Sequence, residues 1–234
     1  VLGDKHGNAI HLFNRDCSSQ RRHQKLIEEG PAPGIDPATR DKVCASAARL
    51  VREAGYSGAA TVEFLMDEQQ QFYMLEVNTR VQVEHPVSEM ITGVDIVKES
   101  IRVAAGEELS WTQDEVQLNG HAIECRINAE DPEHDFRPQP GRIETLQLPG
   151  GPGVRVDTHV REGYVIPPNY DSMIGKLIVH GRDREEAIAR MRVALAEFKC
   201  EPLATTIPLH QRLLQEPPFV QHNFDIYWVE RLLA

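Results

Sequence analysis

The sequence EVNTRVQVEHP, from Glu76 to Pro86, is the most informative stretch of the 234-residue chain. Its polar side chains stand at every second position: Glu76, Asn78, Arg80, Gln82 and Glu84. Because successive side chains of an extended chain point to opposite faces, this spacing predicts one face of carboxylate, amide and guanidinium groups and one that packs. Such a polar row is typical of a site for a charged ligand and its counter-ions. A solvated strand face is the alternative.

A β-hairpin is predicted just before this stretch, with strands over Thr61–Met66 and Gln71–Val77. If its turn is centred near residues 69–70, positions whose numbers sum to about 139 face each other. Glu63 then lies opposite Glu76, with the Cβ atoms about 5 Å apart. Two carboxylates in that arrangement are destabilising unless a cation bridges them. A slipped register that separates them is the alternative.

The residue types in this region suit particular ligands. Glu63, Glu76 and Asn78 form an all-oxygen set for a hard cation such as Mg²⁺, which completes its shell with water or nucleotide phosphates. A metal-free hydrogen-bonded network is the alternative. Arg80 is a planar, permanently charged donor for bicarbonate, carboxylate or phosphate, or else the partner of Glu84 or Glu76 in an ion pair. Glu84 is a candidate general base if a substrate proton comes within its reach.

Composition narrows the class of protein. The chain is 41% hydrophobic and 26% charged, as globular domains are, and its net charge of -11 argues against a nucleic-acid partner. We find no apolar run of membrane-spanning length and no signal peptide, so we expect no membrane association. The four cysteines form no C-x-x-C pair, which disfavours a zinc site and favours a cytoplasmic location.

The chain reads as an α+β fold in two parts, residues 1–106 and 107–234, with the boundary near residues 106–116. In the first part we expect a hairpin over Val1–Asp16, a loop over Gly30–Gly34, a helix from Asp36-Pro37 to Gly55, and a helix over Asp95–Ala105. The dense basic run Arg21–Lys25 is interpreted as a solvated turn. Because the chain opens halfway through a hairpin, we also expect it to be a piece of something longer.

The second part is predicted to be rich in β-strands backed by helices. Strands are expected over His121–Asn128, Arg142–Leu148, Val154–His159 and Lys176–His180, and helices over Asp183–Lys199, Pro208–Leu214 and Asp225–Leu233. The alternation in the first of these strands places Glu124, Arg126 and Asn128 on one face, where Arg126 could simply pair with Glu124. The glycine-rich run Leu148–Gly153 lacks the phosphate-loop pattern and is expected to be a turn.

Five motifs, in order along the chain, resemble biotin carboxylase, a family of the ATP-grasp superfamily. They are RDCSSQRRHQK (Arg15–Lys25), EVNTRVQVEHP (Glu76–Pro86), ITGVD (Ile91–Asp95), HAIECRINAED (His121–Asp131) and PPNYDSMIGKL (Pro167–Leu177). Together they cover nearly the whole chain. The resemblance implies the C-terminal part of an ATP-grasp domain, an antiparallel sheet with helices, over residues 1–106. The β-rich biotin carboxylase C-terminal domain would follow over residues 107–234.

The resemblance also implies an activity and the residues that carry it. ATP would phosphorylate bicarbonate to carboxyphosphate, whose carbon dioxide carboxylates N1′ of biotin on a biotin carboxyl carrier protein. By position, the implied roles are metal binding (two Mg²⁺ or Mn²⁺ ions) for Glu63, Glu76 and Asn78; bicarbonate binding for Lys25, Arg80, Gln82 and Val83; the base for Glu84; biotin binding for Arg126; and ATP contacts for Gln20, His23, Leu65, Glu63 and Glu76. Lys25, Arg80, Glu84 and Arg126 form the implied catalytic set.

Within this family, His85-Pro86 and the stop after Ala234 favour the type found in bacterial acetyl-CoA carboxylases, which serve fatty acid synthesis. Propionyl-CoA, methylcrotonyl-CoA and pyruvate carboxylases are the alternatives. The implied partners are the carrier protein, carboxyltransferase subunits and a second copy, the last through the C-terminal domain near Pro152 and Arg155.

The family's N-terminal domain and glycine-rich lid have no counterpart in this sequence, so we expect little turnover from this chain alone. Another ATP-grasp ligase, such as a carbamoyl-phosphate synthase, and a non-catalytic dimerisation module are the competing interpretations.

Overall fold

The computed structural model describes all residues from Val1 to Ala234, and they form two compact units. Unit 1 holds Val1–Arg15 and Gly30–Asn119, and unit 2 holds Asp16–Glu29 and Gly120–Ala234. The predicted boundary between residues 106 and 107 places residues 16–29 in the first part of the chain. In the structure, the contacts of these residues place them in unit 2. None of the helices combines the length and the apolar character needed to cross a membrane.

Unit 1 is built around a small antiparallel sheet in the order β2 (Ala9–Ile10), β1 (Leu2–Gly3) and β5 (Gly58–Ala59). The predicted hairpin at the chain start is confirmed for β1 and β2, and the Asp4 carboxylate closes its turn by accepting the N–H groups of His6 and Asn8. The buried core of the unit comprises Leu2, Ile10, Leu12, Ala59, Val94, Ile96 and Val116.

Two predicted helices of unit 1 are confirmed. The α1 helix covers Pro37–Glu53, and the Asp36 side chain caps it by accepting the N–H groups of Ala38 and Thr39. The α3 helix covers Ile96–Ala104. A short 3₁₀ helix, η1, follows at Gln113–Glu115.

The hairpin of β6 (Thr61–Met66) and β7 (Phe72–Asn78) is also confirmed, with Glu63 paired to Glu76. The Asp67 N–H donates to the Gln71 carbonyl at the turn. The register shifts by one residue between Glu63 and Phe64, because Phe64 pairs with Met74 and leaves Leu75 as an extra residue. This is a β-bulge.

The prediction that the polar row of Glu76–Glu84 is one extended strand is wrong. The strand ends at Asn78, the chain bends at Arg80, and an unpredicted helix, α2, covers His85–Thr92. Glu84 occupies the position that caps α2, and Gly93 ends it in the left-handed conformation, with φ of 75°. The local reason is Pro86, which fits the first turn of a helix and stops the strand pattern.

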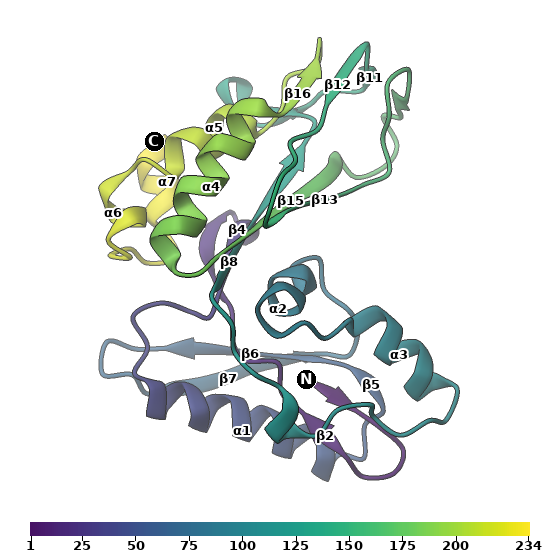
Figure 1. Ribbon diagram of the computed structural model, residues 1–234. Coiled ribbons are helices and arrows are strands. Elements are labelled where there is room, and N and C mark those ends of the chain that lie inside the picture. Colours follow the sequence, from purple (N-terminus) through teal and green to yellow (C-terminus); the bar gives the residue numbers. More distant parts are fainter. The chain divides into compact units, whose positions relative to one another are not determined.

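Unit 2 contains a five-stranded sheet in the order β13 (Val154–Thr158), β15 (Met173–Gly181), β8 (His121–Asn128), β4 (Gln24–Gly30) and β3 (Asp16–Arg21). In Figure 1 the helices of this unit gather on one side of the sheet, and α4 makes extensive contacts with β15 and β8. These helices are α4 (Arg184–Glu197), α5 (Ile207–Leu213), α6 (Pro217–Val220) and α7 (Trp228–Leu233).

One face of the sheet packs into the core of unit 2, and the other face is polar. From β8, Ile123, Cys125 and Ile127 lie in the core, all with 0% exposure, so Glu124 and Arg126 lie on the opposite face. Lys176 on β15 is paired with Arg126, and Asp157 on β13 is paired with Lys176. The predicted strand alternation is therefore confirmed.

Several predictions in unit 2 need correction. The strand expected over Arg142–Leu148 is two short strands, β11 (Gly141–Arg142) and β12 (Thr145–Gln147), which pair with β14 (Val165–Ile166) and β16 (Lys199–Glu201). The α4 helix stops at Glu197, because β16 begins at Lys199. A further small pair joins β9 (Glu130–Asp131) and β10 (Arg137–Pro138), around a 3₁₀ turn, η2 (Pro132–His134).

The β3–β4 hairpin was not predicted, although the solvated turn within it was. Arg22 and His23 form its tip, where both are exposed and have positive φ angles of 47° and 65°.

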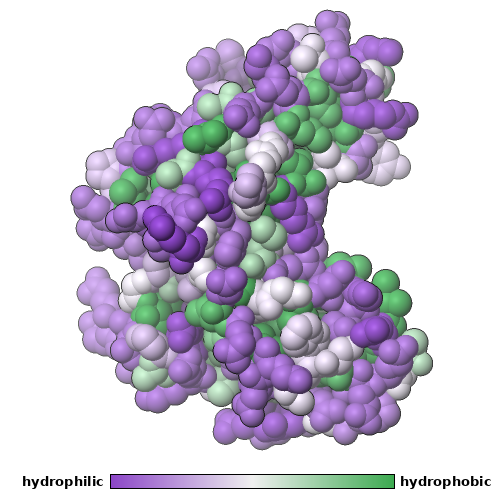
Figure 2. All heavy atoms as spheres, viewed as in Figure 1, coloured by the Kyte–Doolittle hydropathy of each residue, from purple (hydrophilic) through white to green (hydrophobic).

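The face in view in Figure 2 is mostly hydrophilic, in keeping with the chain's high charge content. Large exposed hydrophobic side chains occur on the β6–β7 hairpin of unit 1, at Leu65, Tyr73, Met74, Leu75 and Val77.

Candidate functional site

Three polar side chains of unit 1 converge on the β6–β7 hairpin. The Asn78 side-chain amide donates to Glu63 Oε1 at 3.2 Å and to Glu76 Oε1 at 2.9 Å. Both carboxylates therefore point to the same side of the hairpin, as the predicted register requires. The shared amide donor offsets part of the repulsion between two like charges placed opposite each other.

Gln82 extends this cluster, since its Nε2 donates to Glu63 Oε1 at 2.8 Å. Gln82 is 7% exposed. Its backbone carbonyl is held by His85 Nδ1 at 2.7 Å, which ties the start of α2 to the same segment. Glu76, Asn78 and Gln82 of the predicted row thus meet in one cluster with Glu63, although the row is not one strand, because a bend at Arg80 brings Gln82 back to the hairpin.

Arg80 lies on the exposed side of this segment. Its guanidinium donates weakly to Asn78 Oδ1 at 3.5 Å and to the Val81 carbonyl at 3.4 Å. The guanidinium contacts an amide and a carbonyl, so the alternative of a structural ion pair with Glu84 or Glu76 is not what the structure contains. Exposed and next to Asn78, Arg80 is positioned to bind an anion from solution.

Glu84 is 2% exposed and stands at the start of α2. Val83 precedes it in the turn that leads into the helix. Leu65 lies on β6 and is 46% exposed. The unit 1 residues that the sequence singled out thus lie on the hairpin or on the connection to α2.

The other candidates lie in unit 2. Lys25 is on β4, paired with Gln20 on β3, and His23 is at the hairpin tip. Arg126 on β8 binds Glu28 on β4: its Nε and Nη2 lie 2.6 and 2.5 Å from Glu28 Oε1. Glu28 is fully buried, so this is a strong charge-assisted contact.

Two residues that the sequence did not single out hold the backbone of Arg126. Its carbonyl oxygen accepts hydrogen bonds from Thr206 Oγ1 at 3.0 Å and His210 Nε2 at 2.7 Å. Burial lowers the pKa of His210 to about 4, so its imidazole is neutral at pH 7. Nothing local in the sequence pointed to these contacts, since they join positions about 80 residues apart.

A second buried polar cluster ties the β3–β4 hairpin to the rest of unit 2. The Glu29 carboxylate accepts from His121 at 2.8 Å and from Arg184 at 2.7 Å. Burial by itself would raise the pKa of Glu29, but the hydrogen bonds from His121 and Arg184 outweigh burial and lower it. Glu29 therefore stays charged, which anchors the strand that carries Lys25 and Glu28.

The Glu63, Glu76 and Asn78 set fits a hard cation in its chemistry. All three can offer oxygen atoms from one side of the hairpin, and an amide flip would turn Asn78 Oδ1 toward the carboxylates. The structure has no cluster of three or more His, Cys, Asp or Glu side chains suited to a metal. A cation at the hairpin would therefore draw further ligands from water or phosphate oxygens, as Mg²⁺ commonly does.

Comparison with known proteins agrees with these features. A model of the ATP-binding domain of the carbamoyl-phosphate synthase L chain matches residues 1–112, and a model of the biotin carboxylase C-terminal domain matches residues 124–231. The class is therefore that of proteins with an ATP-grasp domain followed by a biotin carboxylase C-terminal domain.

Two curated relatives illustrate the similarity. The biotin carboxylase of Nostoc sp. is 56% identical over 232 residues, which are 99% of this chain and 52% of the relative. One of the pyruvate carboxylase subunits of Methanothermobacter thermautotrophicus is 53% identical over 98% of this chain and 47% of the relative. The chain spans about half the length of the curated relatives it matches.

Among solved structures, the biotin carboxylase domain dimer of Hydrogenobacter thermophilus 2-oxoglutarate carboxylase, in complex with MgADP, ADP and bicarbonate, superposes with a TM-score of 0.95. It is 48% identical, over 98% of this chain and 51% of that one. The chain belongs to the biotin carboxylase family and corresponds to the C-terminal half of such a protein.

Proposed function

We propose that the natural full-length protein that carries this chain is a biotin carboxylase, which uses ATP and bicarbonate to carboxylate biotin on a biotin carboxyl carrier protein. The observation that supports this most directly is the convergence of Glu63, Glu76, Asn78 and Gln82 at one side of the unit 1 hairpin. Carboxylates held together beside an exposed arginine suit a site where cations and a small anion meet.

In this proposal Glu63, Glu76 and Asn78 hold two Mg²⁺ or Mn²⁺ ions, which would neutralise the phosphate charge of ATP. Leu65 on β6 contacts the nucleotide, as do Gln20 and His23 of unit 2. Leu65 supports this role because it is an exposed apolar side chain on the strand that carries Glu63.

Bicarbonate is bound by Arg80, Gln82, the backbone of Val83, and Lys25. Arg80 offers a planar set of donors that matches a carboxylate-like anion. Gln82 offers a fixed amide that the network around Glu63 holds in place. Glu84 takes the proton of bicarbonate, acting as the general base.

Arg126 binds biotin and stabilises its enolate oxygen. Two observations support this role. The Arg126 side chain contacts the buried Glu28, and the Arg126 carbonyl accepts hydrogen bonds from His210 and Thr206. A guanidinium held from both its side chain and its backbone loses little freedom when it binds a ligand, so it is preorganised.

The acyl-CoA specificity is a further part of the proposal. His85-Pro86 favours an acetyl-CoA carboxylase and fatty acid synthesis, whereas the relatives also include pyruvate and 2-oxoglutarate carboxylases. Because these enzymes share the biotin-carboxylating step, the test is which carboxyltransferase accepts the carboxylated carrier.

We also propose a homodimer formed through the domain over residues 107–234, and a cytoplasmic location, which the four free cysteines favour.

The experiment measures ATP hydrolysis and the transfer of labelled bicarbonate to biotin by the natural full-length protein. We expect hydrolysis to require both bicarbonate and biotin, and the substitution Glu84→Gln to lower kcat by about 100-fold or more, since it removes the general base. Glu68→Gln, on the exposed hairpin turn of the same unit, is the matched control and should leave kcat unchanged. Absence of label in biotin with the wild-type protein would refute the proposal.

A further inference from the structure

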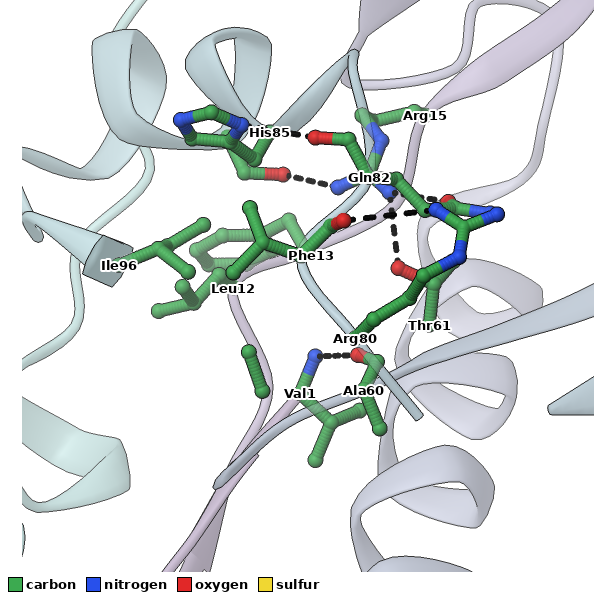
Figure 3. Close-up of a pocket in the computed structure, with 13 residues that line it drawn as sticks. Val1, Leu12, Phe13, Arg15, Ala60, Thr61, Arg80, Gln82, His85 and Ile96 are labelled. Atoms are coloured by element: carbon green, nitrogen blue, oxygen red, sulfur yellow. Dashed lines mark hydrogen bonds between the residues drawn. The ribbon is translucent and has the colours of Figure 1, made fainter. Parts of the chain in front are cut away.

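Arg15 is a polar residue of unit 1 that has no role in the site described above. Its guanidinium reaches three separate segments: Nη1 donates to Ser88 Oγ at 2.8 Å, and Nη2 donates to Thr61 Oγ1 at 3.2 Å and Gln82 Oε1 at 3.4 Å. Ser88 is on α2, Thr61 opens β6, and Gln82 lies between β7 and α2. Figure 3 shows Arg15 beside Gln82 and Thr61 in the wall of a pocket.

The contact with Gln82 decides which way that amide faces. A guanidinium has donors only, so the oxygen of Gln82 must turn toward Arg15. The NH₂ end is then left to donate to Glu63, which it does at 2.8 Å. The network, rather than any local preference of glutamine, therefore sets the orientation of the amide.

The contact between Arg15 and Gln82 is the first in a continuous series of hydrogen bonds. From Arg15 it passes through Gln82 to Glu63, then through the Asn78 amide to Glu76. Ser88 at the Arg15 end is only 1% exposed and Gln82 only 7%, so water competes little for these bonds. Losing the guanidinium would leave buried acceptors unsatisfied and free the Gln82 side chain to turn.

We infer that Arg15 is a positioning residue: it fixes the Gln82 amide and, through it, the Glu63 carboxylate, in the geometry used to bind bicarbonate and cations. This inference rests on the proposed function for its kinetic consequences, though the geometry itself does not depend on it. Arg15 contacts neither bicarbonate nor metal in this scheme. It acts through Gln82.

Lysine cannot replace Arg15 in this role. An ammonium group is a compact charge on a flexible stem and cannot span three acceptors as a planar fork does. We therefore expect Arg15→Lys to keep the charge and the fold but to let Gln82 turn. In the full-length protein, kcat/KM for bicarbonate should fall about 10-fold in Arg15→Lys and up to about 100-fold in Arg15→Met, as hydrogen bonds to charged groups would predict. The KM for ATP should change by a smaller factor than kcat/KM for bicarbonate, because Glu63, which the proposal assigns to the cations, keeps its contact with the Asn78 amide when Gln82 turns away.

A double-substitution cycle separates positioning from a general structural role. If Arg15 acts through Gln82, the pair Arg15→Met with Gln82→Ala should show the same kcat/KM for bicarbonate as Gln82→Ala alone. If the two losses multiply instead, the inference is overturned. Arg40→Lys is the matched control, because Arg40 is a part-buried arginine of unit 1 whose ion pair is with its neighbour Asp41. It should leave bicarbonate kinetics unchanged.

Failure of the proposed function gives a different result. If the wild-type protein shows no bicarbonate-dependent ATP hydrolysis, the proposed function fails, and crystal structures of wild type and Arg15→Met then decide the inference. A Gln82 side chain that leaves Glu63 in the variant supports the positioning role. A Gln82 side chain that stays on Glu63 without Arg15 overturns it.

Discussion

At the scale of single residues, Asn78 is what allows two glutamates to share one side of a hairpin. Its amide donates to both carboxylates, at 3.2 and 2.9 Å, and so supplies positive partial charge between them. One amide compensates two carboxylates only in part, because hydrogen bonds in partly exposed positions are weak in net terms. The arrangement therefore costs stability and is useful for binding a cation.

The substitution Glu76→Gln tests this balance. It removes one of two negative charges that face each other across the hairpin. In EDTA we therefore expect the free energy of unfolding to stay the same or rise by up to about 1 kcal/mol. Mn²⁺ affinity, measured by electron paramagnetic resonance, should fall by about tenfold or more, since a carboxylate ligand becomes a neutral amide. Glu68→Gln is the control. Unchanged Mn²⁺ affinity in Glu76→Gln would contradict the metal assignment.

At the scale of elements, the β-bulge at Leu75 sets the chemistry of the hairpin. Between the bulge and the turn the partners' numbers sum to 138, as in Phe64 with Met74, whereas past the bulge they sum to 139. Without the extra residue, Glu63 would face Leu75, and Glu76 would face Val62. A one-residue slip moves side chains to the other face of a strand, so the bulge is what brings the two carboxylates together.

A buried histidine, His210, holds the backbone of the β8 strand and makes the stability of the protein depend on pH. His210 on α5 donates its Nε2–H to the Arg126 carbonyl while it is buried, which lowers the pKa of His210 to about 4. In the unfolded chain the pKa is near 6.5. Between these values the unfolded chain binds more protons than the folded one, so stability falls as the pH drops from about 6.5 toward 4 and is fully present above about 6.5.

We therefore expect acidification from pH 7 to pH 4 to cost the wild type about 3 kcal/mol more than His210→Gln, which keeps a donor but does not titrate. Urea unfolding at a series of pH values measures this difference. Parallel losses in the two proteins would show that another group dominates acid sensitivity.

At the scale of the whole molecule, the chain builds two separate hydrophobic cores. The core of unit 2 is the larger, since it gathers residues from the five-stranded sheet and from α4 to α7, whereas that of unit 1 is a small cluster around β1, β2 and α3. The site residues divide in the same way. Glu63, Glu76, Arg80 and Glu84 belong to unit 1, whereas Lys25 and Arg126 belong to unit 2.

The larger core makes a direct prediction about stability. Ile123 has 0% exposure on the central strand β8, so Ile123→Ala should lower the free energy of unfolding by about 2–5 kcal/mol through the cavity it leaves. Ile101→Ala is the matched control, because Ile101 is 66% exposed on α3, and we expect a change within about 0.5 kcal/mol. Denaturant unfolding measures both. A small loss at Ile123 would mean that the core closes around the missing atoms.

Local patterns predicted much of this fold correctly. The Asp36-Pro37 start of α1, the alternation of β8 and the β6–β7 hairpin all follow from signals within a few residues. The short α2 helix was missed because its cue, Pro86 in the first turn, sits directly after a strand-like row. The β3–β4 hairpin was missed because its two-residue turn at Arg22-His23 carries no glycine or asparagine.

The sequence by itself determined which side chains are available for binding, and that one hairpin carries both Glu63 and Glu76, because the turn and the two-residue period are local signals. The β-bulge at Leu75 then set Glu63 directly opposite Glu76. Only the tertiary structure decided how those side chains are held. Arg15 reaches Gln82 across 67 positions, and Arg126 reaches Glu28 across 98. Such contacts depend on which strands and helices become neighbours, and that choice is made by the burial of the cores rather than by the residues that touch.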